Sequence, residues 1–179
     1  MTRFVALLGG INVGGNTKVP MADLRALCEE IGWIEVTTYI QSGNVLFSAP
    51  GGALDQEAKL EPAIERRFGF AASVIVRAAS DWPGIVASNP FEEAARVEPN
   101  RLMLCLSKEP PNPDSEQTLQ GRARDGERVR LAGDALWIHY RQGAGTSKLA
   151  PALISRLIGS PVTARNFRTA VQLQQMLAQ

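Results

Sequence analysis

The order in which strand-like and helix-like segments alternate most strongly constrains the fold of this chain of 179 residues. In its first half, short apolar runs alternate with segments whose apolar residues recur every three or four positions. The resulting order is strand, helix, strand, strand, helix, strand, over residues 4–8, 21–31, 34–40, 44–47, 54–68 and 74–76. This β-α-β-β-α-β order is the split βαβ arrangement of a ferredoxin-like domain.

The second half repeats the same order without obvious sequence identity. The expected elements are a strand at residues 101–106, a short helix capped by Asp114 or Ser115, a hairpin at 127–140, a helix at 149–158, a short strand near 161–163 and a closing helix at 166–177. We therefore predict an α+β chain of two ferredoxin-like (α-β plait) domains in tandem. They occupy residues 1–80 and 100–179, joined by a connecting segment at 81–99.

Composition excludes several classes of protein. The 19 basic and 18 acidic side chains nearly cancel, whereas dedicated nucleic-acid binders carry a strong basic excess. This balance argues against nucleic acid as a partner. Cys28 and Cys105 do not form a metal-spaced pair, which favours buried, reduced thiols and predicts no metal site. The first strand is too short for a signal-peptide core and no stretch approaches a membrane span. We expect a cytoplasmic protein with no membrane partner.

A glycine-rich loop at residues 9–18 is the first candidate site. Four glycines let the backbone adopt positive φ and expose N–H groups next to a helix start, where an anion can bind. Asn12, Asn16 and Lys18 would add polar and positive groups. The loop exceeds the ~2–6 residues of an ordinary strand-to-helix connection. The alternative is a tight connection in which glycine and asparagine only satisfy left-handed geometry. The spacing matches neither the P-loop nor the dinucleotide-binding fingerprint.

A second loop at residues 143–148 has the same character. Gly143 and Gly145 precede Ser147 and Lys148, which could meet a phosphate at the start of the following helix. In the alternative reading, Thr146 or Ser147 is an ordinary N-cap for a helix with Pro151 in its first turn.

A different class of function would use the faces of the sheets. Tyr39, Trp137, His139 and Arg141 lie on or beside predicted strands, where aromatic rings could stack bases in an RNA- or protein-binding module. The alternative interpretation is that these aromatic side chains pack in the core. A single histidine on a strand, such as His139, is more often structural. No catalytic triad, metal cluster or pair of acids stands out. The sequence therefore leaves open whether the chain is an enzyme, which cofactor it uses and its oligomeric state.

The chain is similar to a bacterial family known as domain of unknown function 1697. The matching segments are Phe4 to Leu8, Gly10 to Gly15, Met21 with Leu24 and Arg25, Thr38 to Val45, Asn89 to Phe91, Gly143 to Leu149, and Thr163 to Asn166. The resemblance implies two ferredoxin-like units and no assigned activity. The chain departs from the family pattern at Gly9, where an arginine is usual, and at Phe167 and Arg168, where tryptophan and asparagine are usual.

We therefore expect a small phosphorylated or carboxylated ligand to bind at the glycine-rich loops near the cleft between the domains. The Ser42-Gly43-Asn44 segment is first of all a hairpin turn, but its recurrence in the family also makes it a candidate. The expected ligand-binding residues are Asn12, Gly14, Gly15, Asn16, Lys18, Ser42, Asn44, Gly143, Gly145, Ser147, Lys148, Arg165 and Asn166. The alternative is the non-catalytic RNA- or protein-binding module.

Overall fold

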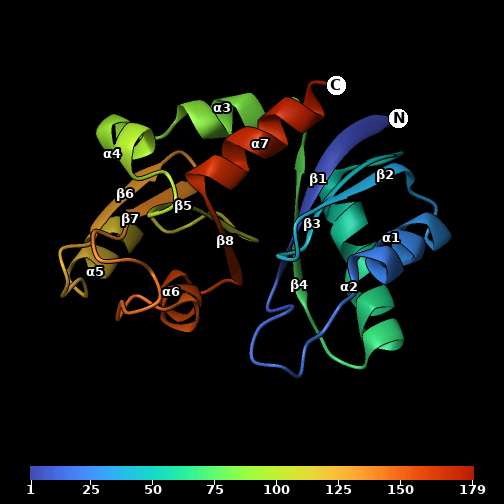
Figure 1. Cartoon of the computed structure of the whole chain (residues 1–179), viewed down its shortest axis with the longest axis horizontal. Coiled ribbons are helices and arrows are strands. Elements are labelled where there is room, and N and C mark those ends of the chain that lie inside the picture. The colour runs from blue at the N-terminus through green and yellow to red at the C-terminus, as the bar shows by residue number, and fades with distance from the viewer. The chain divides into compact units, whose positions relative to one another are not determined.

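The computed structural model describes residues 1–179 and shows a mixed α+β chain (Figure 1). It divides into two compact units. One comprises residues 1–83 together with 173–179, and the other comprises residues 84–172. None of the helices is both long and apolar enough to cross a membrane.

The first unit is a ferredoxin-like domain. Its elements are β1 (Thr2–Gly9), α1 (Met21–Glu30), β2 (Ile34–Tyr39), β3 (Asn44–Ala49), α2 (Ala53–Phe68) and β4 (Ser73–Ala78). The four strands pair antiparallel in the order β2-β3-β1-β4. This is the topology that the β-α-β-β-α-β order predicts. Gly32, at φ +94°, follows the end of α1, as expected for a glycine after a helix.

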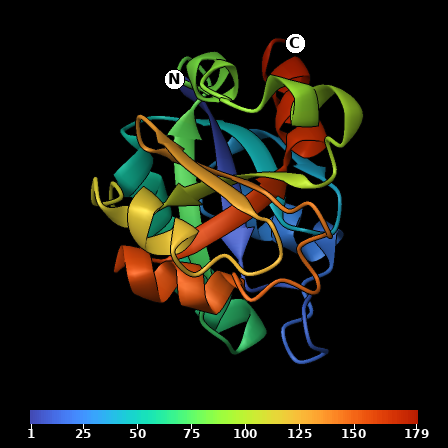
Figure 2. The same ribbon diagram turned by 90° about the vertical axis from the view of Figure 1, so that its left-hand side faces the viewer.

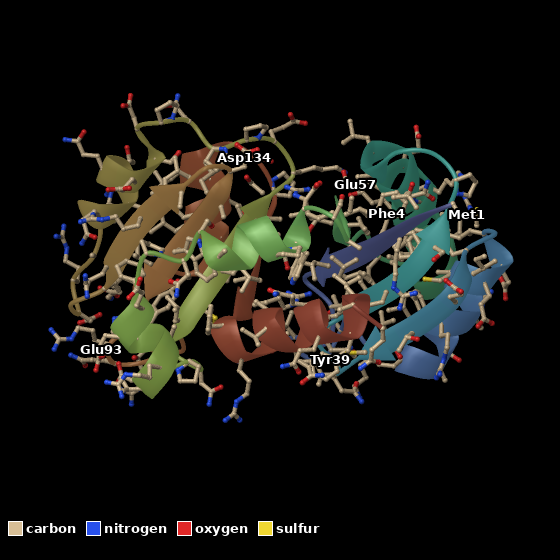
Figure 3. The ribbon with its side chains drawn as sticks, turned by 90° about the horizontal axis from the view of Figure 1, so that it is seen from above. Met1, Phe4, Tyr39, Glu57, Glu93 and Asp134 are labelled. Carbon is tan, nitrogen blue, oxygen red and sulfur yellow. The ribbon has the colours of Figure 1, made fainter.

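The core of the first unit lies between the sheet and its two helices. Phe4, Ala6 and Leu8 of β1 belong to this core, because alternate side chains of a strand point to the same face. Phe4 is labelled in Figure 3. Leu24 of α1 and Ile64 of α2 are fully buried in the same cluster. The ring of Trp33 stacks on Phe47 of β3 with centroids 3.5 Å apart.

The second unit repeats this topology. Two short helices, α3 (Trp82–Ala87) and α4 (Glu92–Val97), precede it, and α4 was not expected from the sequence. The domain itself consists of β5 (Leu102–Ser107), α5 (Ser115–Gln120), β6 (Arg128–Ala132), β7 (Ala135–His139), α6 (Pro151–Ile158) and β8 (Val162–Asn166). Helix α7 (Phe167–Leu177) follows β8, and its residues from Leu173 onward belong to the first unit. The strand order β6-β7-β5-β8 corresponds, strand for strand, to that of the first sheet. The chain thus contains two ferredoxin-like domains in tandem, as predicted.

Side chains cover both faces of the second sheet. Leu136 and Ile138 of β7 join a cluster with α5 and α6, which lie side by side (Figure 2). Trp137 and His139 point to the opposite face. There the indole of Trp137 packs against Phe167 of α7 with ring centroids 6.0 Å apart. Every residue of β7 is therefore buried.

Candidate functional site

The loop between β1 and α1 folds back on itself. The N–H of Asn12 donates to the carbonyl oxygen of Thr17 at 2.8 Å, and the Thr17 hydroxyl donates to the carbonyl of Val13 at 3.0 Å. Gly14 and Gly15, at φ +66° and +83°, make the turn between these contacts. Such backbone conformations favour glycine, since a Cβ strains them. The amide N–H groups of Gly14 and Gly15 have no hydrogen-bond partner within the chain.

Asn12 fastens this loop to two other segments. Its Oδ1 accepts the N–H of Val19 at 2.8 Å, while its Nδ2 donates to the carbonyls of Val19 at 3.2 Å and Gln41 at 2.7 Å. Asn12 itself adopts φ +55°, a left-handed conformation that asparagine tolerates. Because the donors of this amide are already used, its role here is to shape the loop.

The β2–β3 turn, residues 40–43, lies against the same loop. The buried amide of Asn44 donates to the carbonyl of Tyr39 at 2.9 Å and to the Ser42 hydroxyl at 3.0 Å. A Cβ on Gly43 would come within 2.5 Å of Cδ1 of Ile11, so this position requires glycine. Ser42 and Asn44 therefore stabilise the turn, and the first unit brings them beside the predicted loop residues.

A pocket of about 490 Å³ lies between the loop, the start of α1 and this turn. Its lining consists of Asn12, Gly15, Lys18, Val19, Pro20 and Gln41. Lys18 is exposed and forms no ion pair, and Asn16 is an exposed neighbour in the loop. Pro20 is the N-cap of α1, whose first backbone N–H groups have no partner within the helix. The positive groups at this pocket are thus Lys18 and the helix start, with Asp23 in the first turn as a nearby opposite charge.

The second glycine-rich loop, residues 143–148, differs in conformation from the prediction. The Ser147 hydroxyl donates a short hydrogen bond to Oε1 of Glu127 and accepts the N–H of Leu149 at 3.0 Å. Helix α6 begins only at Pro151, with Ala150 at its N-cap. The prediction that Ser147 stands at the helix start, either as a cap or beside an anion, is therefore wrong. Pro151 fixes the first helical position, and residues 147–149 form a separate turn ahead of it.

Glu127 is the buried centre of this second loop region. Its Oε2 accepts the N–H groups of Arg124 at 3.0 Å and Asp125 at 2.8 Å, while Oε1 accepts the Ser147 hydroxyl. Burial by itself raises the pKa of Glu127, but these hydrogen bonds outweigh it and lower the pKa below its ordinary value. Ser147 is therefore committed to an internal carboxylate, whereas Gly145 and Lys148 are exposed.

The two remaining predicted residues lie at the end of β8. The buried guanidinium of Arg165 donates to the Thr163 hydroxyl at 2.7 Å and to the carbonyl of Ala164 at 2.8 Å. Burial lowers the pKa of Arg165 to about 10. Asn166 caps α7, since its Oδ1 accepts the N–H of Thr169 at 2.8 Å. The structure thus gives both residues contacts within the second unit.

The residues suspected for base stacking are mostly buried. Trp137 is fully buried and donates its indole N–H to the Ser88 hydroxyl at 3.2 Å, and His139 contacts Glu98 at 2.8 Å. Trp137 and His139 thus pack in the interior, as the core-packing reading predicts, and they do not form an exposed platform, because α7 and residues 88–98 supply contacts on this face of the sheet. Arg141 is exposed, and Tyr39 is half-buried at the end of β2.

Sequence reasoning missed two residues of these regions, Gln41 and Glu127. The carbonyl of Gln41 accepts a hydrogen bond from Asn12, and Gln41 lines part of the pocket. No pattern of side chains in the sequence indicates a backbone contact of this kind. Glu127 stands with Asp125 among arginines at 122, 124, 128 and 130, and acidic residues within such a run are a signal that could have drawn attention to it. No group of His, Cys, Asp and Glu side chains is arranged to hold a metal ion.

The family model of a protein of unknown function, DUF1697, matches residues 1–137. The chain belongs to this family. A solved structure, that of the conserved bacterial protein SP0830 from Streptococcus pneumoniae, is 26% identical, with a TM-score of 0.73. The similarity covers 100% of this chain and 99% of that one. No protein of curated function matches. The DUF1697 match includes the whole first loop and the turn at residues 40–43, whereas the loop at 143–148, Arg165 and Asn166 lie beyond it.

Proposed function

We propose that this DUF1697 protein binds a small phosphorylated or carboxylated anion in the pocket beside residues 12–18. One observation carries the proposal. The unpaired Lys18 lies at the same pocket as the loop that holds the free N–H groups of Gly14 and Gly15. Backbone N–H groups in a turn, next to a helix start, are a recurrent anion-binding arrangement.

The dimensions of the pocket support a small ligand. Its volume of about 490 Å³ falls within the range of roughly 300–1,000 Å³ typical of small-molecule sites. The contacts of Asn12 with Val19 and Gln41 hold the three sides of the pocket together, so that its shape exists before a ligand arrives. A preformed site loses less conformational entropy on binding.

The proposal rests on the first loop. In the second loop the Ser147 hydroxyl already donates to Glu127, and no helix begins where the predicted anion would sit. Lys148, Gly143 and Gly145 remain candidates for a separate site in the second unit, since Lys148 is an exposed cation and Gly143 has φ +92°.

Ligand titration tests this proposal. We would measure thermal unfolding and calorimetric binding with inorganic phosphate, phenyl phosphate and benzoate as probes. A bound anion at ~100 times its Kd should stabilise the protein by ~2.7 kcal/mol. Lys18→Met should abolish most of this effect, while Lys59→Met, which removes another exposed lysine of the same unit, should not. Binding that is equally strong in Lys18→Met, or that is absent for all three probes, would contradict the proposal.

A further inference from the structure

Two chain segments leave the same end of the β6–β7 hairpin in the second unit. Arg128, at the start of β6, pairs with His139, at the end of β7. Continued by two residues, this register brings Gly126 opposite Arg141, and a Cβ on Gly126 would lie 3.4 Å from Cδ of Arg141. Gly126 has φ +79°, a conformation that favours glycine. The segment before β6 and the segment after β7 therefore lie side by side.

An open pocket of about 470 Å³ lies between these two segments, and we call it the hairpin pocket. Its lining residues are Arg124, Asp125, Gly126, Arg141 and Gln142. Arg124 and Arg141 are exposed, and neither forms an ion pair, not even with Asp125. The ion pairs of this unit engage other arginines, such as Arg101 and Arg130. Two arginines without an acidic partner thus line one pocket.

Side chains from elsewhere in the unit hold the backbone of both arginines. Oε2 of Glu127 accepts the N–H of Arg124 at 3.0 Å, and the guanidinium of Arg101 donates to the carbonyl of Arg141 at 2.8 Å. Glu127 is buried and also accepts the Ser147 hydroxyl, so its charge is already matched by donors inside the fold. Both arginines therefore extend from fixed points, which lowers the cost of ordering them around a ligand.

The charges at the hairpin pocket are mixed, and this limits the class of ligand. The guanidinium groups of Arg124 and Arg141 suit a phosphate dianion, because each can donate two parallel N–H bonds to it. Asp125 brings a carboxylate, which accepts hydrogen bonds but repels a bare anion. The amide of Gln142 both donates and accepts. A ligand that matches this lining has a phosphate at one end and hydroxyl donors at the other.

We propose that the hairpin pocket is a second binding site and that its ligand is a sugar phosphate or another phosphorylated polyol. The phosphate binds Arg124 and Arg141, and a hydroxyl group donates to Asp125. The site uses neither Lys18 nor the loop at residues 9–18, so it goes beyond the proposed function and does not depend on it.

Amide NMR spectra of the full chain, titrated with ribose 5-phosphate, inorganic phosphate and ribose, test the proposal. Ribose 5-phosphate should shift the amides of residues 124–126 and 141–142 with a Kd about tenfold below that of inorganic phosphate, and ribose alone should shift none of them. Arg141→Met should weaken ribose 5-phosphate binding at these amides about tenfold. Arg122→Met is the matched control, because Arg122 is exposed close by in the sequence but does not line the pocket. It should leave the Kd nearly unchanged.

A further variant tests the ligand class. Asp125→Ala removes both the acceptor for the sugar and the repulsion of the anion. It should bind inorganic phosphate at least as tightly as wild type, and it should lose the preference for ribose 5-phosphate. If wild type binds the two phosphates with the same Kd, or if Asp125→Ala keeps the preference, the sugar phosphate class is overturned.

The same spectra separate this proposal from the proposed function, since the amides of Gly14 and Gly15 report on the pocket beside residues 12–18. If ribose 5-phosphate shifts no amide at residues 124–126 and 141–142, the second site is overturned, whatever happens at Gly14 and Gly15. If Arg141→Met and Arg122→Met lose affinity equally, it is overturned as well, because the attraction then comes from the overall charge and not from the pocket.

Discussion

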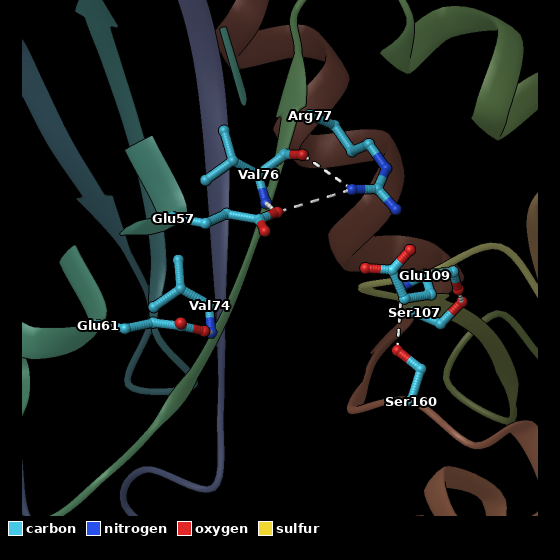
Figure 4. A network of polar contacts seen from close by, with 8 residues as sticks. All are labelled: Glu57, Glu61, Val74, Val76, Arg77, Ser107, Glu109 and Ser160. Carbon is cyan, nitrogen blue, oxygen red and sulfur yellow. Dashed lines mark hydrogen bonds and ion pairs between the residues drawn. The ribbon is translucent and has the colours of Figure 1, made fainter. Parts of the chain in front are cut away.

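Glu57 of α2 accepts the backbone N–H of Val76 on the edge strand β4, with 2.8 Å between Oε1 and N (Figure 4). Glu61, one helical turn further along α2, accepts the N–H of Val74 at 3.0 Å. The spacing fits because four helical residues rise about 6 Å and two strand residues about 6.6 Å. Two carboxylates thus cover N–H groups that an edge strand would otherwise leave without strand partners.

Glu57→Ala should lower the free energy of unfolding by about 1–3 kcal/mol. The substitution leaves the N–H of Val76 without its acceptor in a buried setting, which costs the desolvation of that group. Urea denaturation measures the difference. Glu57→Gln is the control, since it retains a carbonyl oxygen that can accept the same N–H, and it should recover most of the loss. Equal destabilisation by the two variants would show that the charge of Glu57 matters more than its hydrogen bond.

The second unit uses the same arrangement on a different edge. Gln120 and Glu116 of α5, again four residues apart, accept the N–H groups of Val129 and Leu131 on β6, each at 2.8 Å. On β8, the Ser155 hydroxyl of α6 accepts the N–H of Val162 at 3.2 Å. The remaining edge, β2, has instead an irregularity in its pairing between Ile34 and Thr37. Capped or irregular edges resist pairing with other chains.

Both cysteines should be unreactive in the folded protein. Burial raises the pKa of each thiol, Cys28 and Cys105, to about 12, so the reactive thiolate is scarce at neutral pH. We expect iodoacetamide to modify both cysteines much more slowly in the native protein than in guanidinium chloride. Mass spectrometry follows the reaction. Rapid labelling of one cysteine in the native state would show local opening around that thiol, in conflict with its burial.

Glu98 should make the stability of the second unit depend on acid pH. Its hydrogen bond to His139 at 2.8 Å, helped by Arg101, lowers the pKa of Glu98 below its ordinary value of 4.5. A carboxyl group with a lowered folded-state pKa stabilises the fold above its unfolded pKa, and this contribution disappears as pH falls through the folded value. The contribution should therefore be complete at neutral pH and diminish below about pH 4.5.

The substitution Glu98→Gln removes this titration. Its unfolding free energy should fall less steeply than that of wild type as pH is lowered below about 4.5, in denaturation series at fixed ionic strength. Glu93→Gln is the control, because Glu93 pairs with Arg96 at the surface of α4 and such pairs contribute little. If the unfolding free energies of wild type and Glu98→Gln depend on pH in the same way, Glu98 is not responsible for the loss of stability in acid.

The order of the elements could be predicted because its signals are local. Gly32 ends α1 and the Ser42-Gly43 turn joins β2 to β3, each at the expected place. Helix α4 escaped prediction since it is only six residues long and buries Ala94 alone. The predicted start of α6 at Leu149 is two residues too early, because residues 147–149 form a turn held by Glu127, 20 residues from Ser147.

The candidate site was only partly accessible to sequence reasoning. The glycines of the first loop indicate positive φ, but the contacts of Asn12 with Gln41 join segments 29 residues apart and depend on the folded hairpin. The burial of Trp137 agrees with the core-packing interpretation, and the sequence carries a further signal for it. Residues 135–138 are all apolar, without the alternation of a half-exposed strand, and such runs are typical of strands covered on both faces.

Asn12 itself provides a test of how the loop is held. Asn12→Gly permits the same φ of +55° but removes the hydrogen bonds to Val19 and Gln41, so it isolates their contribution. We expect the free energy of unfolding to fall by about 1–2 kcal/mol and the amide of Val19 to exchange faster with solvent. Asn12→Asp keeps an acceptor for the N–H of Val19 but cannot donate to Gln41, so Val19 should retain more of its protection than in Asn12→Gly. If hydrogen exchange at Val19 is unchanged in Asn12→Gly, the side chain does not fix the loop, because the backbone contact with Thr17 is then sufficient.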